Sequence, residues 1–120
     1  MAYSDSQPGL SVLRLAGASD GLVAPRLRSE LTTAVARPDP VIVDLTAVAS
    51  LDPTVVQILL ESLAECELRE RPFLLLLPAD EDAPVRRLFR ISGLAELLPI
   101  VSSWDEALLR AGLAQADAPG

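Results

Sequence analysis

Residues 41–56, VIVDLTAVASLDPTVV, contain a mainly apolar run followed closely by a strong helix start. The run at 41–45 is typical of a strand buried on both faces, as in parallel sheets that helices cover. A second short apolar stretch ends at Leu51. Asp52, Pro53 and Thr54 then follow in the order expected at a helix N-terminus, because Asp caps free amides and Pro needs no donor there. The segment predicts a strand followed by a helix.

Strand and helix signals alternate along the rest of the chain. Strands are predicted at residues 10–16, 41–45, 73–77 and 97–101, with a turn at 17–21. Helices are predicted at 22–36, 52–69, 84–91 and 103–113, the last starting with a capping box of Ser103 and Glu106. This alternation predicts the α/β class, with a small sheet and four helices.

The spacing of apolar residues predicts which side of each helix faces the core. In the helix at 52–69, the inward residues are predicted to be Val55, Leu59, Leu63 and Cys66. In the helix at 84–91, Val85, Leu88 and Phe89 are predicted to point inward, and Arg86, Arg87 and Arg90 mostly outward. We expect Cys66 to behave as a small buried hydrophobe and Trp104 to pack at a helix start.

Composition excludes several classes of function. A net charge of −7 disfavours nucleic acid and anionic membrane surfaces, which attract basic patches. With no His and one Cys, the chain cannot form a Cys/His zinc site, a Ser-His-Asp or Cys-His catalytic group, or an internal disulfide. The sequence also lacks a Gly-rich phosphate loop. We therefore expect no enzymatic activity, no metal and no cofactor.

Length and hydropathy predict one cytoplasmic domain. No apolar run approaches the roughly 20 residues that span a bilayer, and the N-terminus lacks the features of a signal peptide. Residues 10–113 are expected to form the domain. Residues 1–9 are expected to be a flexible arm or a short edge strand, and residues 114–120 a disordered tail.

Three local motifs, in this order, resemble one family. Residues 15–20, LAGASD, are similar to a strand that ends in Gly-Glu-x-Asp before the first helix. Residues 42–45, IVDL, with residues 51–52, LD, are similar to the strand, turn and phosphorylation loop of that family. Residues 85–94, VRRLFRISGL, are similar to its short third helix and the Gly-Leu that follows. From about residue 10 to 113 the chain resembles a STAS domain of the anti-sigma factor antagonists.

The resemblance implies a STAS fold, which is a mixed, mostly parallel sheet of four or five strands with about four helices mainly on one face. In this family the second helix usually starts with Asp-Ser-Ser-Gly, and the second Ser takes phosphate. Asp52, Pro53, Thr54 and Val55 occupy those positions. The resemblance thus implies phosphorylation of Thr54, with Asp52, Pro53, Val55 and Asp20 in the switch loop and partner-binding surface. Pro53 and Val55 depart from the usual Ser and Gly.

The implied function is that of a bacterial partner-switching regulator of transcription and the stress response. The unphosphorylated protein would bind an anti-sigma factor that is also a serine kinase, and a serine phosphatase would reverse the phosphorylation. A phosphate adds about −1.5 to −2 charges and would repel an acidic partner surface. The alternative is a STAS scaffold that is not phosphorylated, in a stress-signalling complex or a lipid-transport ATPase complex. Either function is compatible with a homodimer.

Each candidate site residue could also have a purely structural role. Thr54 and Asp52 could serve only to start the helix, although a helix N-terminus also favours anions and would suit a phosphate. Ser50 is a second hydroxyl near the loop and an alternative phosphorylation site. The outward arginines could bind a partner or form an ordinary solvated face.

Overall fold

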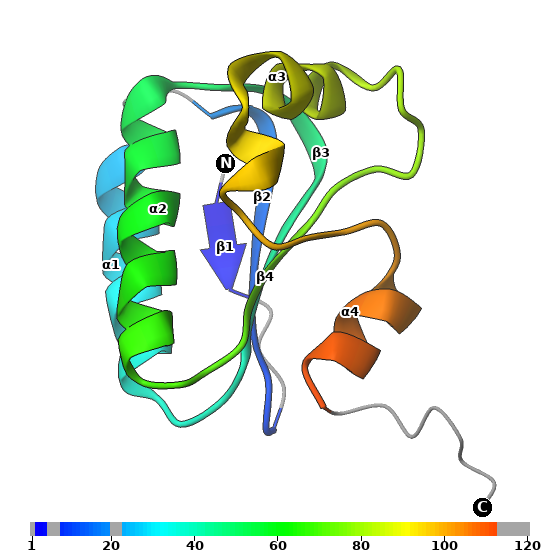
Figure 1. The fold of residues 1–120 in the computed structure, drawn as a ribbon. Coiled ribbons are helices and arrows are strands. Elements are labelled where there is room, and N and C mark those ends of the chain that lie inside the picture. Colours follow the sequence, from blue (N-terminus) through cyan, green and yellow to red (C-terminus); the bar gives the residue numbers. More distant parts are fainter. Residues whose placement is uncertain (1, 5–7, 20–22, 113–120) are drawn as a thin grey trace, which may run out of the picture.

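The computed structural model describes residues 2–4, 8–19 and 23–112, and its elements alternate between strand and helix as predicted (Figure 1). The strands are β1 (Ala2–Ser4), β2 (Ser11–Ser19), β3 (Val41–Leu51), β4 (Phe73–Leu76) and β5 (Ile100–Val101). The helices are α1 (Ala24–Ala36), α2 (Pro53–Leu68), α3 (Pro84–Ser92) and α4 (Trp104–Arg110), with a short 3-10 helix η1 at Leu94–Glu96. The predicted tail at 114–120 lies outside the described residues.

The described strands form one sheet in the order β1-β2-β3-β4-β5. Strands β2 to β5 are parallel to their neighbours, and β1 pairs antiparallel with β2 at one edge. Parallel neighbours need long crossovers, and α1, α2 and α3 lie in those crossovers. The α/β class and the mixed, mostly parallel STAS sheet are confirmed.

The sheet is covered by helices on both faces (Figure 1). Helices α1 and α2 lie side by side on one face, and α4 lies on the other. Neighbouring side chains along a strand point to opposite faces, which explains why the central strands are continuously apolar. Leu13, Val43 and Leu75 are aligned across the strands toward α1 and α2, whereas Val12, Ile42 and Leu74 are aligned toward α4.

The two central strands are longer than predicted. The predicted turn at 17–21 is wrong for residues 17–19, because β2 continues to Ser19 and pairs with β3 as far as Leu51. Register shifts beside Gly17, whose φ is +70°, let the strand bend without ending. Strand β4 pairs with β3 only as far as Asp44. The last part of β3 is therefore paired on one side only and is largely exposed. This explains why its sequence contains fewer large apolar residues than the start of the strand.

The C-terminal part also differs from its predicted boundaries. Instead of a strand at 97–101, the chain forms η1 and then only two strand residues, because the amides of Leu97 and Leu98 both bond to the carbonyl of Leu94. Helix α4 ends at Arg110. Its capping box is confirmed with one difference: Ser103 Oγ accepts from the Glu106 amide at 3.1 Å, but the Glu106 carboxylate accepts from the amide of Ser102 at 2.9 Å.

The predicted inner side of α2 is correct for part of its residues. Val55, Leu59 and Cys66 are fully buried, whereas Leu63 is only partly buried. The structure adds Ile58 and Ser62 to the buried set. This side of α2 packs against α1 as well as the sheet, so the buried stripe is rotated toward α1. Within the described part of the chain, no helix has both the length and the hydropathy to cross a membrane.

Candidate functional site at the start of helix α2

The N-terminus of α2 has the geometry that its sequence predicts. Asp52 is the N-cap residue, with extended backbone angles of φ −76° and ψ 146°, and Pro53 occupies the first turn. The Asp52 carboxylate accepts a hydrogen bond from the Thr54 amide at 2.8 Å. The side chain of Thr54 is exposed to solvent. The structure therefore places a free hydroxyl at the start of a well-capped helix.

The first turn has fewer free amides than a phosphate site needs. Pro53 has no N–H, and the Thr54 amide already donates to the Asp52 carboxylate. The amides of Val55 and Val56 both donate to the Asp52 carbonyl, at 2.9 and 3.1 Å. The sequence suggested that this helix end would bind an anion. In the structure, a phosphate on Thr54 would instead lie close to the Asp52 carboxylate.

Pro53 and Val56 contribute to a shallow apolar groove between the start of α2 and helix α3. The groove has a volume of about 310 Å³. We call it the α2–α3 groove, and it is lined by Leu51, Pro53, Val56, Leu88, Ser92 and Leu94. Thr54 follows Pro53 in the chain but does not line the groove. Helical spacing places its side chain on the α1 side of α2, in line with Ile58 and Glu61.

Val55 does not lie on this surface, although it was predicted to contact a partner. Its side chain is fully buried in the core that α1 and α2 form on the sheet. A branched apolar residue here anchors the helix start, which gives a structural reason for Val where the family usually has Gly. Asp20, also predicted for the switch loop, lies outside the described residues. Ser50 is exposed on β3.

Sequence reasoning missed most of the residues that line the groove. Leu88 was predicted to point into the core with Val85 and Phe89, but only the latter two are fully buried. Leu88 is half-buried and lines the groove instead. In a helix of this length, spacing alone places Leu88 beside the core residues. Only the position of α2 shows that it borders a groove.

The arginines of α3 divide into two groups. The prediction that Arg86 is mainly outward is wrong, because its Nε donates to the carbonyl of Pro78 at 2.5 Å and its guanidinium contacts the Ser102 hydroxyl. These contacts tie α3 to the ends of β4 and β5. Arg87 and Arg90 are exposed as predicted, and within the described residues neither guanidinium group has an ion-pair or hydrogen-bond partner.

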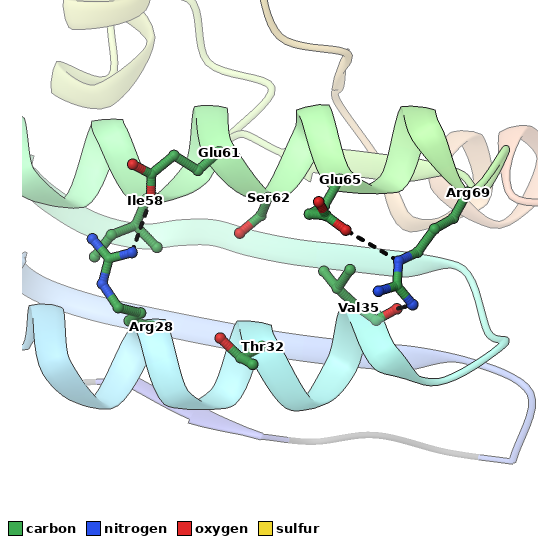
Figure 2. A pocket seen from close by; sticks show the side chains of 8 residues that line it. All are labelled: Arg28, Thr32, Val35, Ile58, Glu61, Ser62, Glu65 and Arg69. Carbon is green, nitrogen blue, oxygen red and sulfur yellow. Dashed lines mark hydrogen bonds and ion pairs between the residues drawn. The ribbon is translucent and has the colours of Figure 1, made fainter.

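A second hollow, of about 280 Å³, lies between α1 and α2 on their outer side. Figure 2 shows that Arg28 reaches across it to Glu61, at 2.9 Å, while Arg69 contacts both Glu65 and the carbonyl of Val35. The charged groups around this hollow therefore bind each other and join the two helices. They leave no uncompensated charge to select a ligand, so we assign this hollow a structural role. In the described part of the chain, no group of acidic or Cys side chains is arranged to hold a metal ion.

The sequence of the chain matches one protein family over most of its length. Residues 4–100 match the family described as "Mlab, STAS domain". None of the curated proteins matches the chain.

Solved structures with the same fold belong to proteins of different roles. An anti-sigma factor antagonist from Mycobacterium paratuberculosis is 26% identical, with a TM-score of 0.75 and 93% of each chain covered. The phosphorylated form of the Bacillus cell fate determinant SpoIIAA is 21% identical, with a TM-score of 0.67 over 92% of this chain and 98% of that one. A sulfate transporter family protein from Wolinella succinogenes is 28% identical, with a TM-score of 0.60 over 89% and 88%. The sequence match and the shared fold together show that this chain belongs to the STAS domain family.

Proposed function

We propose that this chain is a regulator of the anti-sigma factor antagonist type, which binds a protein partner through the start of α2 and is switched by phosphorylation of Thr54. The observation that carries this proposal is the exposed Thr54 hydroxyl in the first turn of α2. The proposed partner is an anti-sigma factor with serine kinase activity. A serine phosphatase would reverse the modification, and the cycle would take place in the cytoplasm.

The proposed switch follows from the charge that a phosphate would add. A phosphothreonine carries about −1.5 to −2 charges near neutral pH. At Thr54 these charges would lie next to the Asp52 carboxylate, one residue along the helix from Pro53 of the α2–α3 groove. An unpaired charge buried on binding costs about 2–5 kcal/mol, which is enough to dissociate a partner of moderate affinity. The chain itself would act by binding alone, without enzymatic activity.

The test is phosphorylation of the purified protein by the serine kinases of its own cell. After incubation with ATP, we expect mass spectrometry to locate phosphate on Thr54, and Thr54→Ser to retain the modification. Thr54→Ala should abolish it, and Ser50→Ala is the matched control because Ser50 is also an exposed hydroxyl before α2. Thr54→Glu should weaken binding of the kinase by tenfold or more. Modification that persists in Thr54→Ala, or binding that ignores both substitutions at Thr54, would contradict the proposal.

A second candidate function is a STAS scaffold that is not phosphorylated, in a stress-signalling complex or a lipid-transport ATPase complex. It is supported by the Asp52 carboxylate, which occupies the Thr54 amide and opposes a second anion there. For this function, pull-down with the whole protein should recover an ATPase subunit or further STAS proteins. That recovery should be equal for the parent protein, Thr54→Ala and Thr54→Glu.

A further inference from the structure

Helix α3 has a large apolar side chain in solvent beside the α2–α3 groove. Val85 and Phe89 anchor the helix in the core, and Gly93, with φ +80°, ends it. Ile91, in the last turn, is 79% exposed. Single exposed apolar residues are common, but this one adjoins an apolar groove on the same helix.

The order of side chains around α3 places Ile91 between the groove and the free arginines. Successive residues of a helix are about 100° apart, so positions three or four apart are neighbours on its surface. Leu88 and Ser92 lie on the groove side. Ile91 comes next, followed by Arg87 and then Arg90. The apolar surface of the groove and Ile91 is thus directly adjacent to the basic surface of Arg87 and Arg90.

The basic character of this edge is unusual for the chain, which has a net charge of −7. The guanidinium groups of Arg87 and Arg90 have no partner in the part of the chain that the structure describes. The acidic residues 80–82 precede the opposite end of α3, and Asp80 Oδ1 accepts from the Asp82 amide within its own turn. The two guanidinium groups are therefore available to external carboxylates.

We propose that the α2–α3 groove, Ile91 and the two arginines receive a protein segment in which an aliphatic or aromatic residue is followed within one helical turn by Asp or Glu. The large apolar residue would enter the groove, and the carboxylates would pair with Arg87 and Arg90. Arginine and aromatic side chains that are buried on binding contribute much of the binding energy of protein interfaces. This inference rests on the proposed function, because it states the chemistry of the partner at the same end of α2.

The acidic character of the partner segment also explains why phosphorylation would weaken binding. A phosphate on Thr54, beside Pro53 of the groove, would repel the partner's carboxylates. The same carboxylates would be attracted by the arginines when Thr54 carries no phosphate. Binding should accordingly weaken as salt increases, since exposed charge pairs are screened over about 8–10 Å at physiological ionic strength.

The test selects the partner segment from random sequences. A phage-displayed library of random 12-residue peptides is panned on the whole protein, and the selected peptides are synthesised and titrated by fluorescence anisotropy. We expect enrichment of Leu, Ile or Phe beside Asp or Glu. The double variant Arg87→Glu/Arg90→Glu should bind these peptides at least tenfold more weakly, and Ile91→Ala should also bind them more weakly. The matched control is Arg26→Glu, because Arg26 is exposed on α1 and lacks a partner among the described residues.

Three results would overturn the inference: no enriched sequence, enriched sequences without acidic residues, or equal affinity for the parent protein and the double variant. Circular dichroism of each variant shows that a loss of binding is not a loss of fold.

This inference and the proposed function can be contradicted independently. If the selected peptides require the two arginines but Thr54 is never phosphorylated, the phosphorylation switch is wrong and this inference stands. If Thr54 is phosphorylated but the selected peptides bind equally well without the arginines, the switch stands and this inference is wrong.

Discussion

The carboxylate of Asp52 accepts a hydrogen bond from the backbone N–H of Thr54 at 2.8 Å. The residue proposed to receive a phosphate thus has a carboxylate bound to its own amide. Two anions would compete for that amide in the phosphorylated protein, so phosphorylation would disturb the helix start in addition to adding charge. Asp52 therefore links the stability of α2 to the state of Thr54.

Replacing Asp52 should measure the contribution of this cap. Asp52→Ala removes the acceptor for the Thr54 amide and should lower the free energy of unfolding by about 1 kcal/mol. Asp52→Asn keeps a side-chain oxygen and should lose much less. Urea denaturation followed by circular dichroism measures both values. Equal losses for the two variants would mean that the charge of Asp52, and not the hydrogen bond, stabilises the helix start.

A second prediction concerns the ion pair of Arg14 and Asp44 beneath helix α4. Asp44 is 4% exposed, and its carboxylate contacts the Arg14 guanidinium while it also accepts from the amide and hydroxyl of Thr46. Arg14→Met would leave this buried carboxylate without its cation and should cost about 3 kcal/mol of stability. Combining it with Asp44→Asn should cost less than the sum of the two single losses. Strict additivity in denaturation experiments would show that the pair is not coupled.

The same ion pair has a spectroscopic signal. The Arg14 guanidinium lies over the ring of Trp104, with 5.1 Å between its central carbon and the ring centroid. Because Trp104 is the only tryptophan in the chain, the tryptophan fluorescence reports on the surroundings of this ring, which include Arg14. Arg14→Met should shift or intensify the emission of the folded protein. Substitution of Arg26, which is on α1, should leave the spectrum unchanged.

Glu61 gives a prediction about pH. Hydrogen bonds from Arg28 and then from Gln57 lower the pKa of the Glu61 carboxyl. A carboxyl with a lowered pKa stabilises the folded state above its unfolded pKa, and this stabilisation is lost as the pH falls through the folded pKa. NMR titration should therefore show Glu61 titrating below the usual Glu range. Arg28→Ala should raise the pKa toward that range, whereas no change would show that the cross-helix contact is absent in solution.

Cys66 should be unreactive in the folded protein. Its side chain is fully buried, and burial raises the pKa of the thiol, so the reactive thiolate is scarce at neutral pH. A thiol reagent such as Ellman's reagent should label the protein only as fast as it opens, and rapidly in denaturant. Rapid labelling of the native protein would contradict the observed packing of α2.

Much of the architecture could be predicted because its signals are local. The helix start at Asp52 needs only a capping side chain and a Pro that requires no donor. The stop at Gly93 needs only a residue that adopts positive φ easily. The buried central strands follow from continuous apolar sequence, and the STAS motifs supplied the order of the elements.

For several of the wrong predictions, a distant part of the chain was responsible. Residues 17–19 extend β2 because β3 continues beside them, and Arg86 is held by the carbonyl of Pro78 and the hydroxyl of Ser102. Leu88 lines a groove because the start of α2 lies beside α3 at one end of the sheet. Such contacts depend on packing between elements, which apolar spacing within one element cannot specify.

The sequence by itself determined the fold class, the helix start and the exposed hydroxyl candidate, since capping and periodicity act over a few residues. Only the tertiary structure decided what surrounds that hydroxyl. Helix α3 packs on β3 and η1 beside the start of α2, and this position creates the groove and leaves Ile91, Arg87 and Arg90 beside it. The physical reason is that a binding surface is assembled from side chains of separate elements, and their relative positions are set by the shared core beneath them.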